Sequence, residues 1–377
     1  MFISKKRTIY SMLRRKQYVI ILMNNFLKRG YNMANIQKSF TDFHNSIRLD
    51  VDDNGLLKDY KDQVVEGLKD HLPESVKFET FLQGSYSVYT GIKSCDENID
   101  FDIDVAVAFE IDRTDYEDPR KPKLWVKEAL IKIFPDAEVK LKVPCVTATF
   151  SEKDAEKSVH VDVAVYAKEA GNYFLAKAKE FSTSENRCWE EADPKGLKEK
   201  INSHIADSDD RSQFRRCIRY LKRWKDNKFS QEYKPTGIGL TINVMEKFLA
   251  KKSTDFLTGK VEYNDLDCLK QIVYSMKNSF EYEYNDTDEW HYRLHAVLPV
   301  KPNSDTYSKM TGNQMSNFKD KLSKLYDDLV FATETEDEHD ATKRLNYQFG
   351  EDFLIISEKE VTENNLRNAF VTDYPSA

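Results

Sequence analysis

Apolar residues in the first half of the chain recur with two different periods. Between residues 56 and 72 they recur at helical spacing, and Pro73 predicts the end of that helix. Residues 77–83 have the composition of a strand. Residues 101–110 alternate between polar and apolar side chains and then become wholly apolar, which is typical of a central strand. The first half therefore begins as a mixture of helix and sheet.

The same pattern predicts the remaining elements. Residues 123–134 are expected to be helical, a pair of strands is broken at Pro144, and another strand covers residues 158–167. After residue 195 the segments become helical by period, at 211–229, 237–252, 313–333 and 338–349. Residues 334–340, ETEDEHD, predict a solvated acidic loop. The order predicts an α+β half followed by an α-helical half.

Three regions follow from this order. Residues 1–33 are basic and contain an apolar patch too short to span a bilayer, so we expect a flexible extension. A basic amphipathic helix lying on a membrane or on RNA is the alternative. Residues 34–200 are expected to form the α+β core, and residues 201–377 a helical domain.

Composition narrows the functional class. The 377 residues carry a net charge of −7, which excludes the overall basic character of a nucleic-acid coat protein. The five cysteines are scattered without a CxxC pair, and the seven histidines show no metal-ligand spacing. This usage predicts a reduced, cytoplasmic protein without structural zinc and without stable membrane insertion.

Aspartates interrupt the strand at residues 101–110. Asp102 and Asp104 lie two residues apart and therefore project from the same face of a strand. Asp162 alternates with valines in a later strand and points away from their face. If the two strands are neighbours, the three carboxylates converge and can hold two Mg²⁺ or Mn²⁺ ions. A single Asp-x-Asp is more often a strand end without metal, and Asp100 could replace one member of the pair.

A Gly-Ser pair precedes these aspartates. Gly84 would let backbone N–H groups approach a phosphate, and the Ser85 hydroxyl adds a donor. Most such pairs are plain turns. The ordered set of strand, Gly-Ser, aspartate strand and third-carboxylate strand is more specific than any one of its members.

This ordered set resembles the nucleotidyltransferases of the polymerase-beta type. Over residues 34–360 it is more similar to the bacterial CD-NTases of CBASS anti-phage systems (the cGAS- and DncV-like cyclic oligonucleotide synthases). The segments that carry the resemblance are QGSYSVYTGIK, DIDVAVAF, VHVDVAVYA, WEEADPKGL, RRCIRYLKRWKD, KPTGIGLTI and RLNYQFGEDF. The zinc-binding insert of the animal DNA sensor has no counterpart, so the resemblance does not extend to direct sensing of double-stranded DNA.

The resemblance implies a role for each motif residue. Asp102 and Asp104 would bind both metals, and Asp162 would bind one and help to deprotonate the attacking ribose hydroxyl. The residues expected to bind nucleotide are Gln83, Gly84, Ser85, Lys222, Arg219 and Thr236. Solvated basic positions are the alternative for Lys222 and Arg219, and a helix N-cap is the alternative for Thr236.

The implied activity is synthesis of a cyclic di- or trinucleotide from NTPs, ATP among them, with release of pyrophosphate. The product would be a second messenger for a separate effector protein. A nucleotidyltransferase acting on tRNA, protein or a small molecule, or making linear oligoadenylate, is one alternative. An RNA-binding sensor with a vestigial site is another, and activating RNA could bind the basic helix at 211–225 even in an active enzyme.

Overall fold

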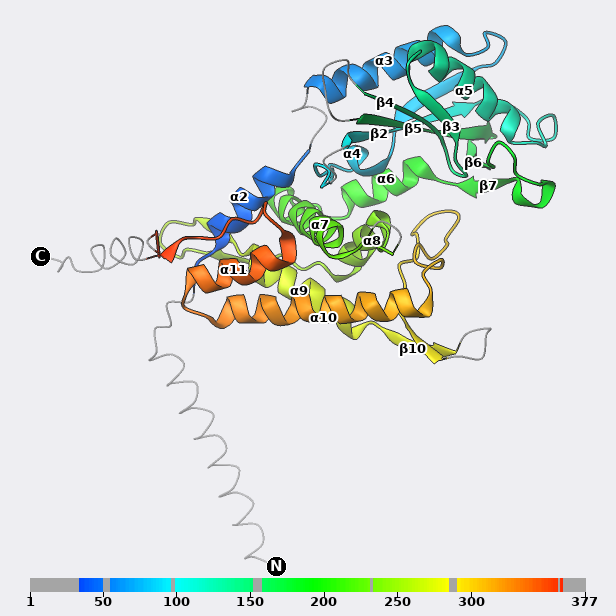
Figure 1. Ribbon diagram of the computed structural model, residues 1–377. Helices are drawn as coiled ribbons and strands as arrows, with labels where there is room; N and C mark the ends of the chain where they lie inside the picture. The colour runs from blue at the N-terminus through cyan, green and yellow to red at the C-terminus, as the bar shows by residue number, and fades with distance from the viewer. Residues whose placement is uncertain are drawn as a thin grey trace, which may run out of the picture.

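The computed structural model describes residues 34–49, 55–95, 99–151, 158–230, 233–284, 290–358 and 360–361. The predicted extension, residues 1–33, lies outside the described residues. Figure 1 shows a lobe built on a β-sheet above a lobe built of helices. The predicted α+β class, with a mixed sheet and a helical lobe, is confirmed.

The first lobe contains a seven-stranded sheet within the described residues. The strand order is β1-β2-β5-β4-β3, and β6 and β7 continue from β5. β2 and β5 run parallel, and the other pairs are antiparallel. The strands are β1 (Phe78–Leu82), β2 (Ile99–Phe109), β3 (Glu138–Leu141), β4 (Val146–Ser151), β5 (Ser158–Glu169), β6 (Asn172–Lys177) and β7 (Cys188–Ala192).

The two faces of the central strands differ in chemistry. Val105 of β2 and Val163 of β5 are fully buried in one core, which is covered by α3 (Gly55–His71) and α5 (Arg120–Ile133). The alternate positions of β2 and β5 carry the aspartates, followed by small residues such as Ala106. This two-residue period leaves one face for helices and the other for a polar site.

The Gly-Ser pair begins a single helical turn, α4 (Gly84–Ser87), where the sequence predicts a turn. Gly84 has a φ of +66°, a conformation that favours glycine. The turn follows β1, and its approach is fixed by a backbone hydrogen bond from Gln83 N to Asp104 O of 3.2 Å. α4 therefore lies directly over the aspartate end of β2.

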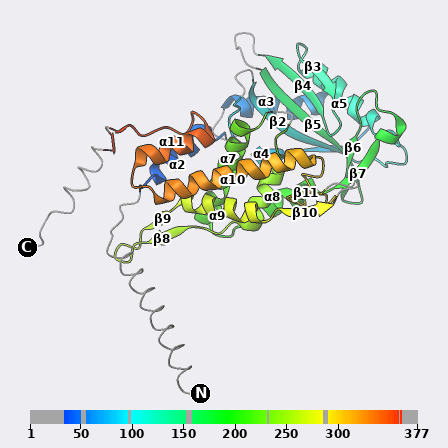
Figure 2. The same ribbon diagram turned by 60° about the horizontal axis from the view of Figure 1, so that its bottom comes forward.

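Within the described residues, seven helices contribute to the core of the second lobe, and one of them, α6, also links it to the sheet (Figures 1 and 2). Trp224 and Tyr220 of α7 are fully buried, as is Phe318 of α10. The seven helices are α2 (Gln37–Ile47), α6 (Pro194–Ser203), α7 (Ser208–Lys228), α8 (Gly237–Lys247), α9 (Asp265–Asn278), α10 (Gly312–Glu334) and α11 (Glu338–Phe349). α2 packs against α7 and α9, although the predicted domain boundaries group it with the sheet.

Several elements differ from the sequence prediction. α8 ends at Lys247 rather than near residue 252, because Lys251 N donates to Gln213 Oε1 and Lys252 begins β8. The predicted acidic loop at 334–340 is shorter, since α10 ends at Glu334 and α11 begins at Glu338. The pattern did not predict the helices α2, α6 and α9 or the strands β6 and β7. It also did not predict the small elements β8 (Lys252–Thr254), β9 (Val261–Tyr263), β10 (Glu281–Tyr284), β11 (Trp290–Arg293) and η1 (Ser184–Asn186).

No helix among the described residues is long and apolar enough to cross a bilayer.

Candidate active site

Three carboxylates meet on one face of the sheet. β2 and β5 are parallel neighbours, and their register places Asp104 directly beside Asp162 and Asp102 beside His160. The predicted convergence of Asp102, Asp104 and Asp162 is therefore present in the structure. Of the two candidate Asp-x-Asp pairs, only Asp102 and Asp104 can be placed, because the side chain of Asp100 lies outside the described residues.

The carboxylates repel one another. Burial, followed by the charges of Asp162 and Asp102, raises the pKa of Asp104 to about 7. Such a group is poorly stabilised as an anion unless a cation is close. Carboxylate oxygens are the donors that Mg²⁺ and Mn²⁺ prefer, so this donor set fits divalent ions.

Neighbouring strands and loops orient the outer two carboxylates. Thr147 of β4 donates its hydroxyl to Asp162 Oδ1 at 2.5 Å, and Lys142 Nζ lies 3.8 Å from the same oxygen. His160 Nδ1 lies 3.2 Å from Asp102 Oδ1. Sequence reasoning missed Thr147. The available signal was the alternation of the predicted strand around Thr147, which places this hydroxyl on one face of the strand. The structure shows that this strand pairs with the Asp162 strand.

The Gly84 turn approaches these carboxylates closely. A Cβ on Gly84 would lie 2.0 Å from Asp104 Oδ2, so no other residue fits without displacing that side chain. Gln83 accepts a hydrogen bond from Tyr166 OH at 3.1 Å through Oε1. Gln83, Gly84 and Ser85 all line the cavity above the sheet.

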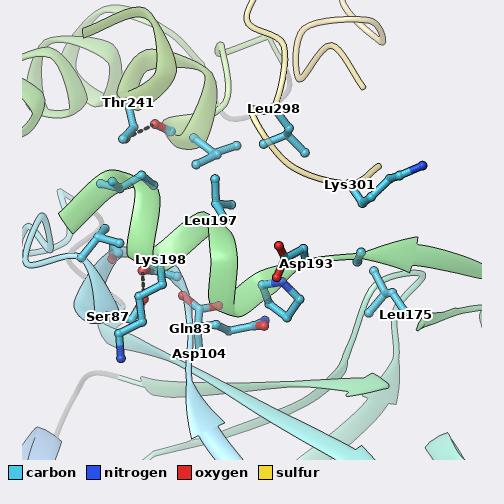
Figure 3. Close-up of a pocket in the computed structure, with 18 of the residues that line it drawn as sticks. Gln83, Ser87, Asp104, Leu175, Asp193, Leu197, Lys198, Thr241, Leu298 and Lys301 are labelled. Carbon is cyan, nitrogen blue, oxygen red and sulfur yellow. Dashed lines mark hydrogen bonds between the residues drawn. The ribbon is translucent and has the colours of Figure 1, made fainter. Parts of the chain in front are cut away.

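Two cavities meet at this point. The first, of about 460 Å³, lies between the lobes and exposes more apolar than polar surface, from residues of the sheet lobe, α6, α8 and the segment at 298–304. In Figure 3, Gln83 and Asp104 lie below α6, with Leu197, Thr241 and Leu298 above them. The second cavity, of about 510 Å³, is more polar. The lining residues common to both are Ser85, Asp104, Lys222 and Gly237.

The second cavity is rich in lysine. Lys93, Lys222, Lys225 and Lys234 line it together with Asp102 and Asp104. Among these, sequence reasoning named only Lys222 as a phosphate ligand. Lys225 and Lys234 both lie within reach of Asp226, at 3.1 Å and 3.2 Å from Oδ1. The cavity is therefore suited to a polyanion that approaches the carboxylates.

Lys222 reaches the junction of the two cavities. Its Nζ donates to Thr90 O at 2.9 Å and to Thr90 Oγ1 at 3.1 Å. Burial, with the charges of Lys225 and Arg219, lowers the pKa of Lys222 to about 7. A bound phosphate would favour the charged ammonium.

The other two predicted nucleotide ligands are placed differently. Arg219 is 4 % exposed and donates to Gly91 O and to His44 Nε2, both at 3.0 Å. Thr236 caps α8 by accepting a hydrogen bond from Gly239 N at 3.1 Å. Neither residue lines the two cavities. The structure thus brings Lys222 to the site and does not bring Arg219 or Thr236 to it.

The basic helix at 211–225 directs much of its charge inward. Arg216 is paired with Asp265, Arg223 donates to Lys93 O, and Arg215 stacks over Tyr89. Arg223 and Lys222 are also buried. These side chains contact protein groups, so they do not form a free basic surface of the kind that the RNA hypothesis assumes.

The part of the chain that contains this site resembles known proteins. Residues 78–166 match the nucleotidyltransferase domain of the family described as cyclic GMP-AMP synthase DncV-like. A curated cyclic GMP-AMP synthase of Escherichia albertii is 29 % identical over 192 residues. That match covers 49 % of this chain and 40 % of the relative, so it spans less than half of the curated protein.

Solved structures share the fold. The Vibrio cholerae DncV cyclic AMP-GMP synthase superposes with a TM-score of 0.60 at 16 % identity, over 87 % of this chain and 98 % of that one. A Vibrio cholerae DncV mutant in complex with ATP, GTP and 5MTHFGLU2 gives 0.59 at 15 % identity, over 87 % and 98 %. Escherichia coli DncV bound to 3'-deoxy GTP gives 0.51 at 20 % identity, over 73 % and 70 %. The carboxylate site lies inside the matched domain, so the chain is similar to DncV-like nucleotidyltransferases in sequence over that domain and in fold over most of its length.

Proposed function

We propose that this protein joins NTPs into a cyclic di- or trinucleotide by transferring a nucleotidyl group from one NTP to the ribose hydroxyl of another. The observation that carries the proposal is the junction of two cavities at Ser85, Asp104 and Lys222, directly over three convergent carboxylates. Two nucleotides can meet there without a macromolecular acceptor. Repeating the transfer on the linear intermediate closes the ring, and each phosphodiester bond that forms releases one pyrophosphate.

Asp102, Asp104 and Asp162 would hold two Mg²⁺ or Mn²⁺ ions. Such ions neutralise phosphate charge and lower the pKa of the attacking hydroxyl. Asp162 lies on β5 and Asp104 on β2, and β1, which leads into the Gly84 turn, lies on the other side of β2. The carboxylate of Asp162 is oriented by Thr147. It is the carboxylate we assign to receive the proton of the ribose hydroxyl. Positioning and charge neutralisation account for most catalysis of phosphoryl transfer, and this site provides both.

The cavities suit different parts of the nucleotides. The lysines of the second cavity fit a triphosphate, and the N–H groups of the Gly84 turn with the Ser85 hydroxyl can contact it. The apolar lining of the first cavity, including Leu197 and Leu298, fits bases. Gln83 and Lys222 complete the nucleotide contacts that we assign.

ATP and GTP are the proposed substrates. A relative carries the name cyclic GMP-AMP synthase, and a neighbouring structure was determined in complex with ATP and GTP. We further propose that the product is a second messenger for a separate effector in anti-phage (CBASS) defence, in the cytoplasm. The proposed synthesis of a cyclic nucleotide supports the effector as a partner, and no contact in the structure is used for it.

Purified protein incubated with the four labelled NTPs, singly and together, tests the proposal. With Mg²⁺ or Mn²⁺ we expect a product that resists phosphatase, because a ring has no terminal phosphate. An Asp102→Asn/Asp104→Asn double variant should make none. Chromatography and mass would identify the bases. A phosphatase-sensitive product, or incorporation of label only when tRNA or protein is added, would overturn the cyclase proposal in favour of a transferase with another acceptor.

A further inference from the structure

A second cluster of metal-ligating groups lies in the helical lobe, away from the aspartates. Glu281 and Glu283 are two residues apart on β10 and project from the same face, and His295 follows the paired strand β11. One ligand atom from each of the three residues lies within 4.8 Å of the other two. Because a hairpin separates these residues in the sequence, the spacing of the histidines does not indicate the cluster.

A fourth residue fixes the orientation of the imidazole. His295 Nδ1 lies 2.9 Å from Asp305 Oδ2, and Asp305 Oδ1 accepts hydrogen bonds from Ala296 N and Tyr307 N, both at 3.0 Å. Asp305 is thus held by the backbone and in turn holds Nδ1. The other nitrogen, Nε2, faces Glu283 Oε1 at 2.7 Å. A carboxylate that holds one imidazole nitrogen while the other faces ligands is the arrangement found around protein-bound metals.

The distances and charges suit a small transition ion. Ligand atoms around tetrahedral Zn²⁺ lie about 3.4 Å apart at bond lengths near 2.1 Å, a spacing that lies between the 2.7 Å and 4.8 Å limits of this cluster. Arg293 pairs with Glu281 in the strand register, but its guanidinium donates to Met310 O and Ser308 O. The Glu281 side chain has no ion pair within the part of the chain that the structure describes.

We propose that Glu281, Glu283 and the Nε2 of His295 bind Zn²⁺, with Asp305 as the positioning residue. One imidazole and two carboxylates, with water as a fourth ligand, form a donor set that Zn²⁺ accepts and that differs from the oxygen-only set of the aspartates. The site is independent of the proposed nucleotidyl transfer and does not require it.

The site would brace a loop that reaches the first cavity. His295 and Asp305 stand at the base of the segment 296–304, where Thr306 N donates to Ala296 O at 2.9 Å and Leu298 N to Ser304 O at 3.0 Å. Leu298 and Lys301 of this segment line the cavity, and Leu298 lies above Leu197 in Figure 3. Zn²⁺ would tie β10 to this base and reduce the opening of the loop.

Cobalt titration of chelator-treated, full-length protein tests the site, with excess Mg²⁺ present to compete at the aspartates. Co²⁺ with a nitrogen ligand gives visible ligand-field bands, which Zn²⁺ then removes by displacement. We expect such bands in the unmodified protein and in the Asp102→Asn/Asp104→Asn variant. His295→Gln and Glu281→Gln should weaken binding at least about tenfold, and Asp305→Asn about 10- to 100-fold.

Glu262→Gln, which alters an exposed acid on β9, is the matched control and should bind Co²⁺ as the unmodified protein does. Hydrogen exchange of residues 296–305 should slow on addition of Zn²⁺ in the unmodified protein alone. Equal Co²⁺ affinity in the unmodified protein and Glu281→Gln, or no bands in either, would overturn the proposal. Because Glu281 is exposed, its variant remains informative if His295→Gln fails to fold.

Discussion

At the scale of single residues, the site depends on how closely the chain can approach Asp104. Gly84 and Gly171 both have positive φ, at +66° and +86°. A Cβ at Gly84 would lie 2.0 Å from the Asp104 carboxylate, whereas a Cβ at Gly171 would meet nothing within 4 Å. A substitution at Gly171 therefore introduces backbone strain alone, whereas a substitution at Gly84 introduces strain and also crowds the site.

We predict that Gly84→Ala lowers kcat of nucleotidyl transfer at least about a hundredfold, because displacement of a reacting group by an ångström has that effect. Gly171→Ala should cost only the strain of a left-handed residue, about 1–2 kcal/mol of stability, with unchanged kcat. Steady-state kinetics and thermal unfolding of both variants check this. Similar kinetics in the two variants would contradict the close approach at Gly84.

His44 is the residue whose titration matters for stability. Burial, followed by the charge of Arg219, lowers its pKa to about 3 from an ordinary 6.5. The unfolded chain then binds this proton more readily between pH 6.5 and 3, so stability falls as pH drops through that window. By pH 5 the loss from His44 should reach about 2 kcal/mol.

We therefore predict that His44→Gln, which keeps an acceptor for Arg219, loses less stability between pH 7 and pH 5 than the unmodified protein. His71→Gln, at an exposed histidine on α3, is the control. Urea unfolding at several pH values measures the difference. Identical pH slopes for the unmodified protein and His44→Gln would show that His44 is not the responsible group.

At the scale of elements, buried polar contacts join the helices of the second lobe. Asp265, in the first turn of α9, is fully buried and accepts hydrogen bonds from four groups of α7. Arg216 contributes two of them, at 2.6 Å and 2.8 Å, with Tyr220 at 2.8 Å and Gln213 at 3.0 Å. These three residues lie on one face of α7, at helical spacing. The pairing fixes the register of α7 against α9.

Removing the charge at Asp265 should destabilise this lobe strongly. We predict that Asp265→Asn lowers the free energy of unfolding by about 3–5 kcal/mol, because it leaves the half-buried Arg216 without a carboxylate. Asp42→Asn removes the exposed partner of Lys38 on α2 and should cost at most about 0.5 kcal/mol. Denaturant unfolding of the two variants gives the comparison, and equal losses would contradict a special role for the buried pair.

The pattern of apolar residues predicted most of the long helices and the central strands, but it missed α2, α6 and α9 and the short edge elements. α3, α7, α10 and α11 have continuous helical periodicity, so tertiary contacts only adjust their ends. β8 to β11 are three or four residues long, and their side chains are mostly exposed. Such short strands carry no apolar period, and their pairing depends on the helices that support them.

At the scale of the whole molecule, α7 connects the helical lobe to the segment that follows the Gly84 turn. Arg219, Lys222 and Arg223 lie on one face of α7 and donate to the carbonyl oxygens of Gly91, Thr90 and Lys93. These carbonyls belong to the segment that follows the Gly84 turn. The basic positions that resemble phosphate ligands therefore also hold one lobe to the other.

This arrangement separates the roles of two predicted nucleotide ligands. We predict that Arg219→Lys lowers stability by about 1.5–3 kcal/mol, the range for a hydrogen bond to a charged group, and changes KM for NTPs less than about threefold. Lys222→Met should raise KM about tenfold or more, equivalent to about 1.4 kcal/mol of binding. Kinetics and thermal unfolding measure both. A KM change for Arg219→Lys as large as that for Lys222→Met would restore Arg219 as a nucleotide ligand.

The sequence alone determined most of the long elements, the order of the two lobes and the residue types at the carboxylate site, because local period and motif spacing are written along the chain. It also placed Asp102 and Asp104 on one face, since that follows from the geometry of any strand. Only the tertiary structure decided that β5 lies beside β2, which brings Asp162 to Asp104, and that Thr147 orients it. The tertiary structure also decided which groups the arginines of α7 contact, because whether an arginine faces a phosphate or a carbonyl depends on the packing of distant segments.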